Sequence, residues 1–158
     1  MNKLVLMLSF VLLFGANIAA AHFTGNDSVD GDEIRWGGST TYSTAWNAGV
    51  SLWNGLNPID ILPDSYFTIE DLTIADTSQP LLGWYAAYDP NNDYIYFNTY
   101  STRMPSLSSS QKKNVAAHEL GHALGLGHHS ISNNVMDDTS FYTSIGTHDE
   151  SDYDYLWN

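Results

Sequence analysis

The chain has 158 residues, no cysteine and a formal net charge of −13, with 18 acidic residues against 5 basic ones. This length suits a single domain with its own hydrophobic core. A nucleic-acid partner is disfavoured because a phosphate backbone needs a basic surface, and a lipid-anchored lipoprotein is excluded because its anchor needs a cysteine. Without disulfides, the domain must rely on its core and on any bound metal.

Residues 1–21 have the pattern of a secretory signal peptide. Lys3 precedes an apolar run over residues 4–14, and three alanines over residues 19–21 supply a small-residue cleavage site. An uncleaved membrane anchor is the alternative, but the apolar run is short and is followed by glycine and asparagine. We therefore expect a secreted, extracellular protein with no stable membrane association after the signal is cleaved.

The segment 22–33 is polar and rich in glycine and aspartate, which predicts a flexible N-terminus of the mature chain. The remaining residues, 34–158, form one predicted domain. A first strand is expected at 34–36. From Tyr42 onward the apolar residues recur with the spacing of a helix, which Pro58 terminates. Four hydroxyl side chains are candidate caps for the start of that helix: Ser39, Thr40, Thr41 and Ser43.

Short β signals follow, separated by turn residues. Apolar residues between these turns predict strands at 59–61, 67–69, 72–74, 81–88 and 94–100. Residues 89–93, Asp-Pro-Asn-Asn-Asp, join the last two strands and are expected to form an ordinary turn. A calcium site is the alternative for these five residues, although no other feature of the sequence supports calcium.

Two more helices have recognisable starts. Ser108 and Gln111 have the spacing of a capping box, which predicts a helix that runs through residues 118–122. Thr147 and Glu150 have the same spacing and predict a C-terminal helix. Tyr153, Leu156 and Trp157 make its apolar stripe, and its acidic residues are expected to form a solvated face: Asp149, Glu150, Asp152 and Asp154.

The helix predicted after Ser108 carries the chemistry of a metal site. His118 and His122 lie four apart, so both imidazoles project from one helix face and can bind a single ion, with Glu119 beside them as a base. Gly125 can adopt the left-handed conformation that ends a helix, so the chain can turn back and bring His128 to the same ion. Three neutral histidines and one open position are typical of a catalytic zinc, whereas a structural zinc has a fourth protein ligand.

These residues resemble a known protein family. The string HELGHALGLGH fits the motif H-E-x-x-H-x-x-G-x-x-H of the metzincin metalloproteases, and Met136 stands where their methionine turn has its methionine. The eight-residue step from His128 to Met136 is most similar to the matrixins, including their small secreted bacterial relatives. His129 directly follows His128, so a ligand register shifted by one residue is the alternative, which the step to Met136 disfavours.

The resemblance implies an α+β metzincin (zincin-like) catalytic domain over 34–158. Its parts would be a mixed twisted sheet, a long N-terminal helix, a zinc-binding helix and a C-terminal helix. Met136 would form a hydrophobic floor beneath the histidines. An extended peptide would bind along the sheet edge, and residues 137–146 would form the wall of the pocket beyond the scissile bond. The substrate-binding candidates at this edge are Trp84, Tyr85 and Ala86.

The resemblance also implies a secreted zinc-dependent endopeptidase. One catalytic zinc, held by His118, His122 and His128, would activate a water molecule, and Glu119 would accept its proton and pass it to the leaving amine. The partners would be polypeptide substrates, and we expect a monomer. Two alternatives come from other functional classes: a catalytically silent metzincin-fold module that binds proteins, and an adaptor with a structural zinc.

Some features of the family are missing from the sequence. A cysteine switch cannot block the zinc, because the chain has no cysteine. Asp138 stands where matrixins usually have a proline two residues after the methionine, so the pocket wall is expected to differ. The histidines of the second, structural zinc have no counterpart, since Ala86, Ala87 and Tyr96 occupy that part of the chain.

Overall fold

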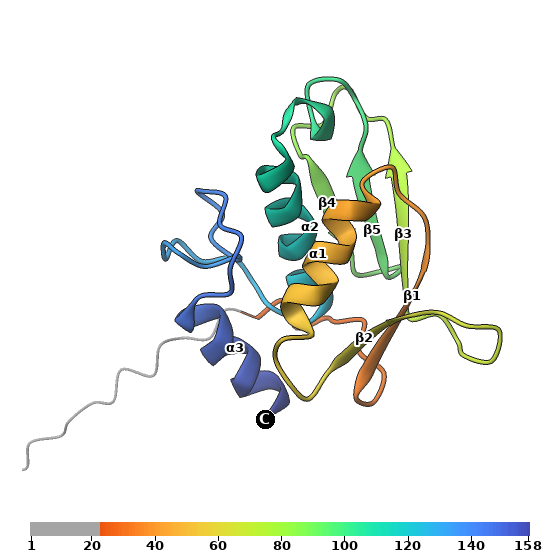
Figure 1. Ribbon diagram of the computed structural model, residues 1–158, viewed down its shortest axis with the longest axis vertical. Coiled ribbons are helices and arrows are strands. Elements are labelled where there is room, and N and C mark those ends of the chain that lie inside the picture. Colours follow the sequence, from red (N-terminus) through yellow and green to blue (C-terminus); the bar gives the residue numbers. More distant parts are fainter. Residues whose placement is uncertain (1–22) are drawn as a thin grey trace, which may run out of the picture.

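The computed structural model describes residues 23–158, so the predictions for residues 1–22 lie outside the described part of the chain. Five strands form one sheet, two helices lie on one face of it, and a third helix lies to the side, beyond a long irregular segment (Figure 1). Within residues 23–158, no helix has the length and apolar character needed to cross a membrane. The predicted α+β fold, with a mixed sheet and three helices, is confirmed.

The sheet has the order β2-β1-β3-β5-β4. Strands β2, β1, β3 and β5 pair in parallel, whereas β4 pairs antiparallel to β5 and forms the edge of the sheet. Among residues 23–158, one side of β4 therefore has no strand partner. The bounds of the strands are β1 (Glu33–Gly38), β2 (Asp60–Pro63), β3 (Leu72–Thr77), β4 (Ala86–Asp89) and β5 (Tyr94–Asn98).

One predicted strand, at residues 67–69, is wrong. Residues 64–71 form a loop between β2 and β3, in which the Ser65 backbone N–H donates to the Thr68 hydroxyl at 2.9 Å. This local turn leaves the apolar side chains of the loop without a strand or helix to cover them. Three of them are almost fully exposed: Tyr66 (94%), Phe67 (92%) and Ile69 (87%).

A second predicted strand, at 81–88, is shorter than expected. Residues 81–85 are irregular, and the buried side chain of Asn98 bonds to the backbone of Gln79 and Trp84, on either side of residues 80–83. Its amide nitrogen donates to the carbonyls of Gln79 and Trp84, at 3.0 and 3.2 Å, and its oxygen accepts from the Gln79 N–H. Strand pairing therefore begins only at Ala86.

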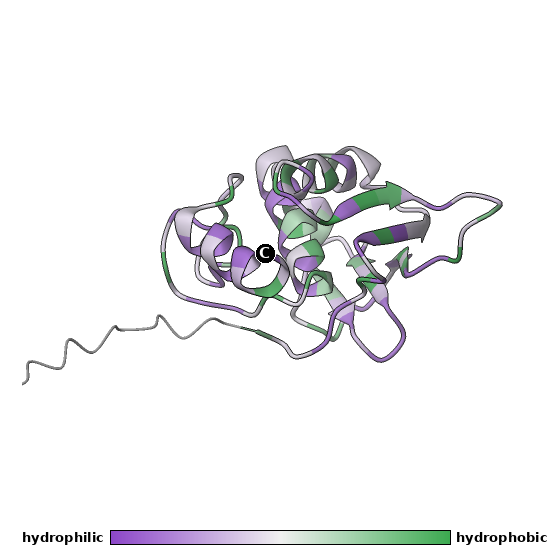
Figure 2. Ribbon diagram, turned by 90° about the horizontal axis from the view of Figure 1, so that it is seen from below, coloured by the Kyte–Doolittle hydropathy of each residue, from purple (hydrophilic) through white to green (hydrophobic). Residues whose placement is uncertain are grey.

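Helices α1 (Ser43–Trp53) and α2 (Ser109–Ala123) pack side by side over the sheet, and a short 3₁₀ turn, η1 (Met104–Ser106), precedes α2. Hydrophobic residues lie on the strands and on the helices beside them, and also on several of the loops (Figure 2). Gly49 permits the close approach of the two helices, because a Cβ there would lie 3.0 Å from the Ala117 nitrogen. The Trp53 indole N–H donates to the Ala117 carbonyl at 2.8 Å and ties the helices together.

The start of α1 is not capped as predicted. Its N-cap residue is Tyr42, which makes no side-chain capping bond. The hydroxyls of Thr40 and Thr41 donate to the carboxylate of Asp76, in β3, and the Thr41 backbone N–H donates to the same carboxylate at 2.9 Å. These side chains therefore connect the loop to the sheet and do not cap the helix.

Helix α3 (Thr147–Trp157) also starts differently from the prediction. Its N-cap is Gly146, whose N–H donates to the carboxylate of Asp149 at 3.1 Å, so the predicted capping box of Thr147 and Glu150 is wrong. The predicted solvated face is wrong for two of its members, because Asp149 is fully buried and Asp152 is 4% exposed. The start of α3 is therefore set by a buried carboxylate.

The apolar stripe of α3 joins this helix to the rest of the molecule. Tyr153 is buried and stacks on Trp53 of α1, with 6.1 Å between the ring centroids. The Tyr153 hydroxyl accepts from the Ile59 N–H at 3.1 Å, and the Trp157 indole donates to the Leu124 carbonyl at 3.1 Å. The predicted stripe is therefore the face through which α3 packs.

Residues 23–30, which we expected to be flexible from their composition, make specific contacts with the end of α2. The backbone N–H groups of Thr24 and Ser28 donate to the carbonyls of Gly125 and Ala123, at 3.0 and 2.8 Å. Carbonyls at a helix C-terminus lack partners within the helix, so this segment supplies hydrogen bonds that α2 cannot make internally. A composition rich in polar residues does not reveal such backbone contacts.

Candidate metal centre and active-site cleft

Helix α2 places the first two candidate ligands. Its start has the predicted capping box, in which the Ser108 hydroxyl accepts from the Gln111 N–H at 3.2 Å and the Gln111 side chain accepts from the Ser108 N–H at 2.9 Å. His118 and His122 then lie one turn apart on the same helix face, with their ring centroids 4.8 Å apart. The short-range pattern of the sequence is enough to set this part of the site.

The turn after α2 brings in the third candidate ligand. Gly125 has a φ of +88°, the left-handed conformation predicted from the sequence, and the chain reverses direction there. The Nε2 atom of His128 lies 2.9 Å from the Nε2 atoms of both His118 and His122. Residues that come from a helix and from the loop beyond it therefore converge on one point.

The hydrogen bonds of the rings show that this cluster suits a cation. The Nδ1 atoms of His118 and His122 lie 2.9 and 2.8 Å from the carbonyls of Val135 and Leu126. A carbonyl can only accept, so each Nδ1 carries the hydrogen and each Nε2 presents a lone pair. Lone pairs that face one another repel unless a cation lies between them. Three imidazole nitrogens in this arrangement fit the donor set of a catalytic zinc.

Burial keeps the two helical histidines neutral, which is the form that binds a metal. Burial is the main cause that lowers the pKa of His122 to about 3, and the neighbouring His118 adds to the effect. Burial also lowers the pKa of His118, although the Val135 carbonyl opposes this change. Both rings are therefore neutral at physiological pH without any help from a bound ion.

His129 does not join the cluster. Its ring is buried and lies 3.1 Å from the carboxylate of Asp149, on the side of α3. The alternative ligand register, shifted from His128 to His129, therefore has no support in the geometry.

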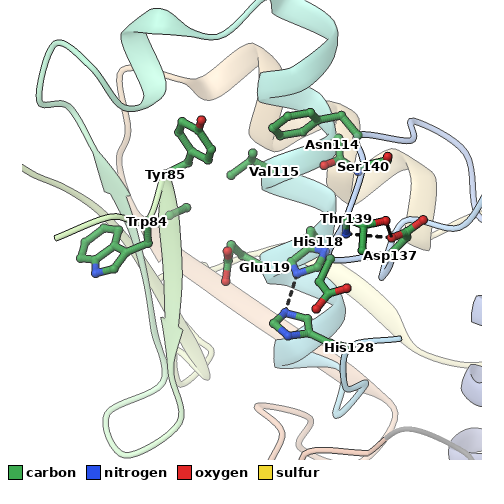
Figure 3. A pocket seen from close by; sticks show the side chains of 13 residues that line it. Trp84, Tyr85, Asn114, Val115, His118, Glu119, His128, Asp137, Thr139 and Ser140 are labelled. Carbon is green, nitrogen blue, oxygen red and sulfur yellow. Dashed lines mark hydrogen bonds between the residues drawn. The ribbon is translucent and has the colours of Figure 1, made fainter. Parts of the chain in front are cut away.

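Glu119 lies beside the three histidines, and its carboxylate is directed toward the cleft (Figure 3). Its Oε2 accepts from the Tyr88 backbone N–H, in β4, at 2.9 Å. Burial raises the pKa of Glu119 to about 7, and the Tyr88 N–H partly opposes this rise. A carboxyl with a pKa near neutrality can both accept and release a proton, which is the property required of a general base and acid.

Met136 is buried, and its side chain packs against α2 at Gly121. A Cβ at Gly121 would collide with the Met136 sulfur, and it would lie 3.0 Å from the Trp53 ring. Gly121, between the two helical ligands, is therefore the residue that leaves room for the methionine. That Met136 forms the floor beneath the histidines stays a prediction.

A cleft of about 350 Å³ opens in front of these residues. The predicted substrate-binding residues Trp84, Tyr85 and Ala86 line one side of it, opposite residues 137–141 (Figure 3). The rings of Tyr85 and Phe141 lie 6.0 Å apart. These two segments line the cleft together, and their binding of substrate stays a prediction.

Three contributors to the site were missed by the sequence reasoning. Asp149 was assigned to a solvated face because it stands among other acidic residues. Asn114 lies one turn before His118, is buried, and donates to the Tyr142 carbonyl at 2.5 Å, which holds the cleft wall against α2. The sequence offered no clear signal, because Asn114 follows two lysines, a residue type that is usually exposed, and stands at the start of the apolar run Val115-Ala116-Ala117. The Tyr88 N–H is a backbone group and has no signal in the side-chain sequence.

A search against protein families matches residues 16–154 to the family described as matrixin. A search against curated proteins found no match. The family match covers most of the chain and includes every residue of the cluster, the cleft and the methionine turn. The chain therefore belongs to the matrixin family of zinc metallopeptidases.

Proposed function

We propose that the protein is a secreted zinc endopeptidase whose ligands are His118, His122 and His128 and whose general base is Glu119. The observation that carries this proposal is the convergence of three Nε2 atoms, 2.9 Å apart for two of the three pairs, next to a buried carboxylate in a cleft. A structural zinc would need a fourth protein ligand, and no further His, Cys, Asp or Glu of residues 23–158 joins this group.

A zinc ion held by the three histidines would supply a Lewis acid that polarises the scissile carbonyl and acidifies water. Glu119 accepts the proton of the attacking water and passes it to the leaving amine. The Tyr88 N–H fixes Oε2 of the carboxylate, so Oε1 is the oxygen left to receive the proton. His118 and His122 hold their orientation through the carbonyls that their Nδ1 atoms contact.

The substrates proposed are extended polypeptides. In the part of the chain that the structure describes, no strand pairs with the outer side of β4, so a peptide can add to the sheet there through backbone hydrogen bonds. Trp84 and Tyr85 precede this edge and line the cleft, and they would contact substrate side chains together with Ala86. Residues 137–141 would contact the substrate beyond the scissile bond.

The remaining parts of the proposal rest on the sequence. Residues 1–21 would be removed as a signal peptide, 22–33 would begin the mature chain, and 34–158 would form the catalytic domain, acting outside the cell as a monomer of the small secreted bacterial type. Calcium is not included. Asp89 accepts from Asn91 and Asn92 within the turn, and Asp93 accepts from the hydroxyls of Ser28 and Tyr88, so both carboxylates already have hydrogen-bond donors.

The decisive test measures zinc content and peptide cleavage together. The mature protein should contain one zinc per chain and cleave casein or a quenched peptide in a manner that a chelator abolishes. Glu119→Gln should keep the zinc and lower turnover by about 10²–10⁴-fold. Glu150→Gln, which alters an exposed carboxylate of α3, is the matched control and should cleave like the wild type. A wild-type protein loaded with zinc but without chelator-sensitive cleavage would leave the silent binding module as the better hypothesis.

A further inference from the structure

The three candidate ligands are held unequally. His118 and His122 each have their Nδ1 bonded to a carbonyl, at 2.9 and 2.8 Å. His128 is exposed, and within residues 23–158 no hydrogen bond holds its Nδ1. The direction of the His128 ring therefore depends on the backbone that carries it. A histidine that binds zinc usually has a second hydrogen-bond partner that orients its ring. Because His128 has none within these residues, its position depends on a neighbouring residue that holds the His128 backbone in place.

The next residue, His129, makes hydrogen bonds through its backbone N–H, its backbone carbonyl and both ring nitrogens. Its backbone N–H donates to the Met136 carbonyl and its own carbonyl accepts from the Asp138 N–H, both at 3.2 Å. Its ring Nδ1 accepts from the Ile131 N–H at 3.2 Å, and its Nε2 lies 3.1 Å from Oδ1 of Asp149. Because an N–H donates to Nδ1, the hydrogen of the neutral ring is on Nε2 and is donated to Asp149.

Asp149 connects this ring to the rest of the site. Besides His129, its buried carboxylate accepts from the backbone N–H groups of Val135 at 2.5 Å, Met136 at 3.1 Å and Gly146 at 3.1 Å. The Val135 carbonyl is the group that orients His118. The Asp149 carboxylate is thus connected to the segment that carries His128, to the methionine turn and, through Val135, to His118.

We propose that His129 is a positioning residue, which fixes the backbone of His128 through its bond to Asp149 and so sets the third ligand in place. The proposal rests on the proposed function in one respect, namely that His128 binds zinc. The family motif assigns a role to position 128 and none to position 129. The role of His129 follows from its burial and its four hydrogen bonds.

Two amide variants test this role because their side chains carry the same group and differ only in length. Glutamine at position 129 places an amide N–H where Nε2 lies and can still donate to Asp149, whereas asparagine reaches only as far as Nδ1. Zinc affinity is measured by competition with a chromophoric chelator. We expect His129→Gln to bind zinc within about threefold of the wild type, and His129→Asn to bind about 10–100-fold more weakly.

Cobalt supplies a readout of ligand geometry that does not depend on activity. The wild type and His129→Gln loaded with Co²⁺ should share one visible spectrum, whereas His129→Asn should absorb more weakly because a misplaced His128 leaves room for additional water ligands. Ile34→Ala, which removes a fully buried side chain in β1, serves as the control for general loss of stability. It should melt at a lower temperature and keep the wild-type zinc affinity.

Each outcome decides the proposal. Equal zinc affinity in His129→Asn and the wild type would overturn it, and so would an equal loss in the glutamine and asparagine variants. If His129→Asn does not fold, NMR of the wild-type imidazoles decides, since a hydrogen on Nδ1 of His129 contradicts the proposed bond. A wild type that binds zinc without cleaving peptides refutes the proposed function alone, while a wild type that binds no zinc refutes both.

Discussion

Two regions of the molecule meet at the cleft and are held together in different ways. The first, residues 33–123, contains the sheet and helices α1 and α2, and buried apolar side chains fill the space between them. The second, residues 124–146 with α3, has no strand and few buried apolar residues. Its backbone is fixed mainly by the buried side chains of Asn134, Asp149 and His129.

This difference matters because the candidate zinc ligands come from both regions. His118 and His122 belong to the apolar region, whereas His128 belongs to the polar one. Apolar packing tolerates small changes in shape, but a buried hydrogen bond requires a partner at a defined distance and angle. Substitutions in the first region should therefore lower global stability, and those in the second should lower zinc affinity as well.

The largest effect is expected for Asp149→Ala. It leaves three backbone N–H groups and the His129 ring buried without their acceptor, so the free energy of unfolding should fall by about 3–5 kcal/mol. Urea unfolding of the zinc-free protein measures this change, and zinc affinity should fall in parallel. Asp154→Ala, an exposed residue of the same helix, should change stability by no more than about 0.5 kcal/mol. A similar loss in both variants would contradict the special role of Asp149.

Ile34→Ala tests the apolar region. Ile34 is fully buried in β1, and its truncation should lower the free energy of unfolding by about 3 kcal/mol through lost burial and the cavity left behind. Zinc affinity of the folded protein should not change, because β1 contributes no residue to the cluster. If Ile34→Ala also weakened zinc binding, the apolar region would contribute to the geometry of the cluster and the contrast between the two regions would be wrong.

Gly121→Ala tests the contact between the regions. The added methyl group collides with the Met136 sulfur, so α2 and the methionine turn must move apart, at a cost of about 1–3 kcal/mol in the free energy of unfolding. Zinc affinity should also fall, because Gly121 lies between His118 and His122. Gly83→Ala is the control, since a Cβ there meets nothing within 4 Å. Comparable unfolding curves for the two variants would refute the packing described for Met136.

The smallest expected effect is the loss of stability at alkaline pH that comes from Tyr88, in the edge strand β4. Burial is the main cause that raises the pKa of the Tyr88 phenol from its ordinary value of 10.0 to about 12. The unfolded chain therefore releases this proton first, and the free energy of unfolding should decrease as the pH rises from about 10 to about 12. Tyr88→Phe should lose less stability over that interval, as pH-dependent unfolding can measure. Parallel curves for both proteins would argue against the raised pKa.

The sequence predicted those parts of the fold and the site that depend on short-range spacing. The capping box at Ser108, the left-handed Gly125 and the one-turn step from His118 to His122 were all correct. The failures at 67–69, at the start of α1 and at Asp149 share another cause. In each, a polar side chain satisfies backbone groups of its surroundings, and two of the three involve distant segments, which a local pattern does not contain.

The wall of the cleft has a consequence for how this protein can change. Residues 137–146 are anchored at one end by the bridge between His129 and Asp137, at the other by Gly146, and in between by the Asn114 side chain and the ring contact of Phe141 with Tyr85. The stretch between these anchors is mostly exposed, and loops of this kind tolerate insertions and deletions at small entropic cost. Lengthening or shortening it would reshape the pocket without moving the three histidines of the cluster. A single scaffold could thus yield a series of proteases that differ only in the bonds they cleave.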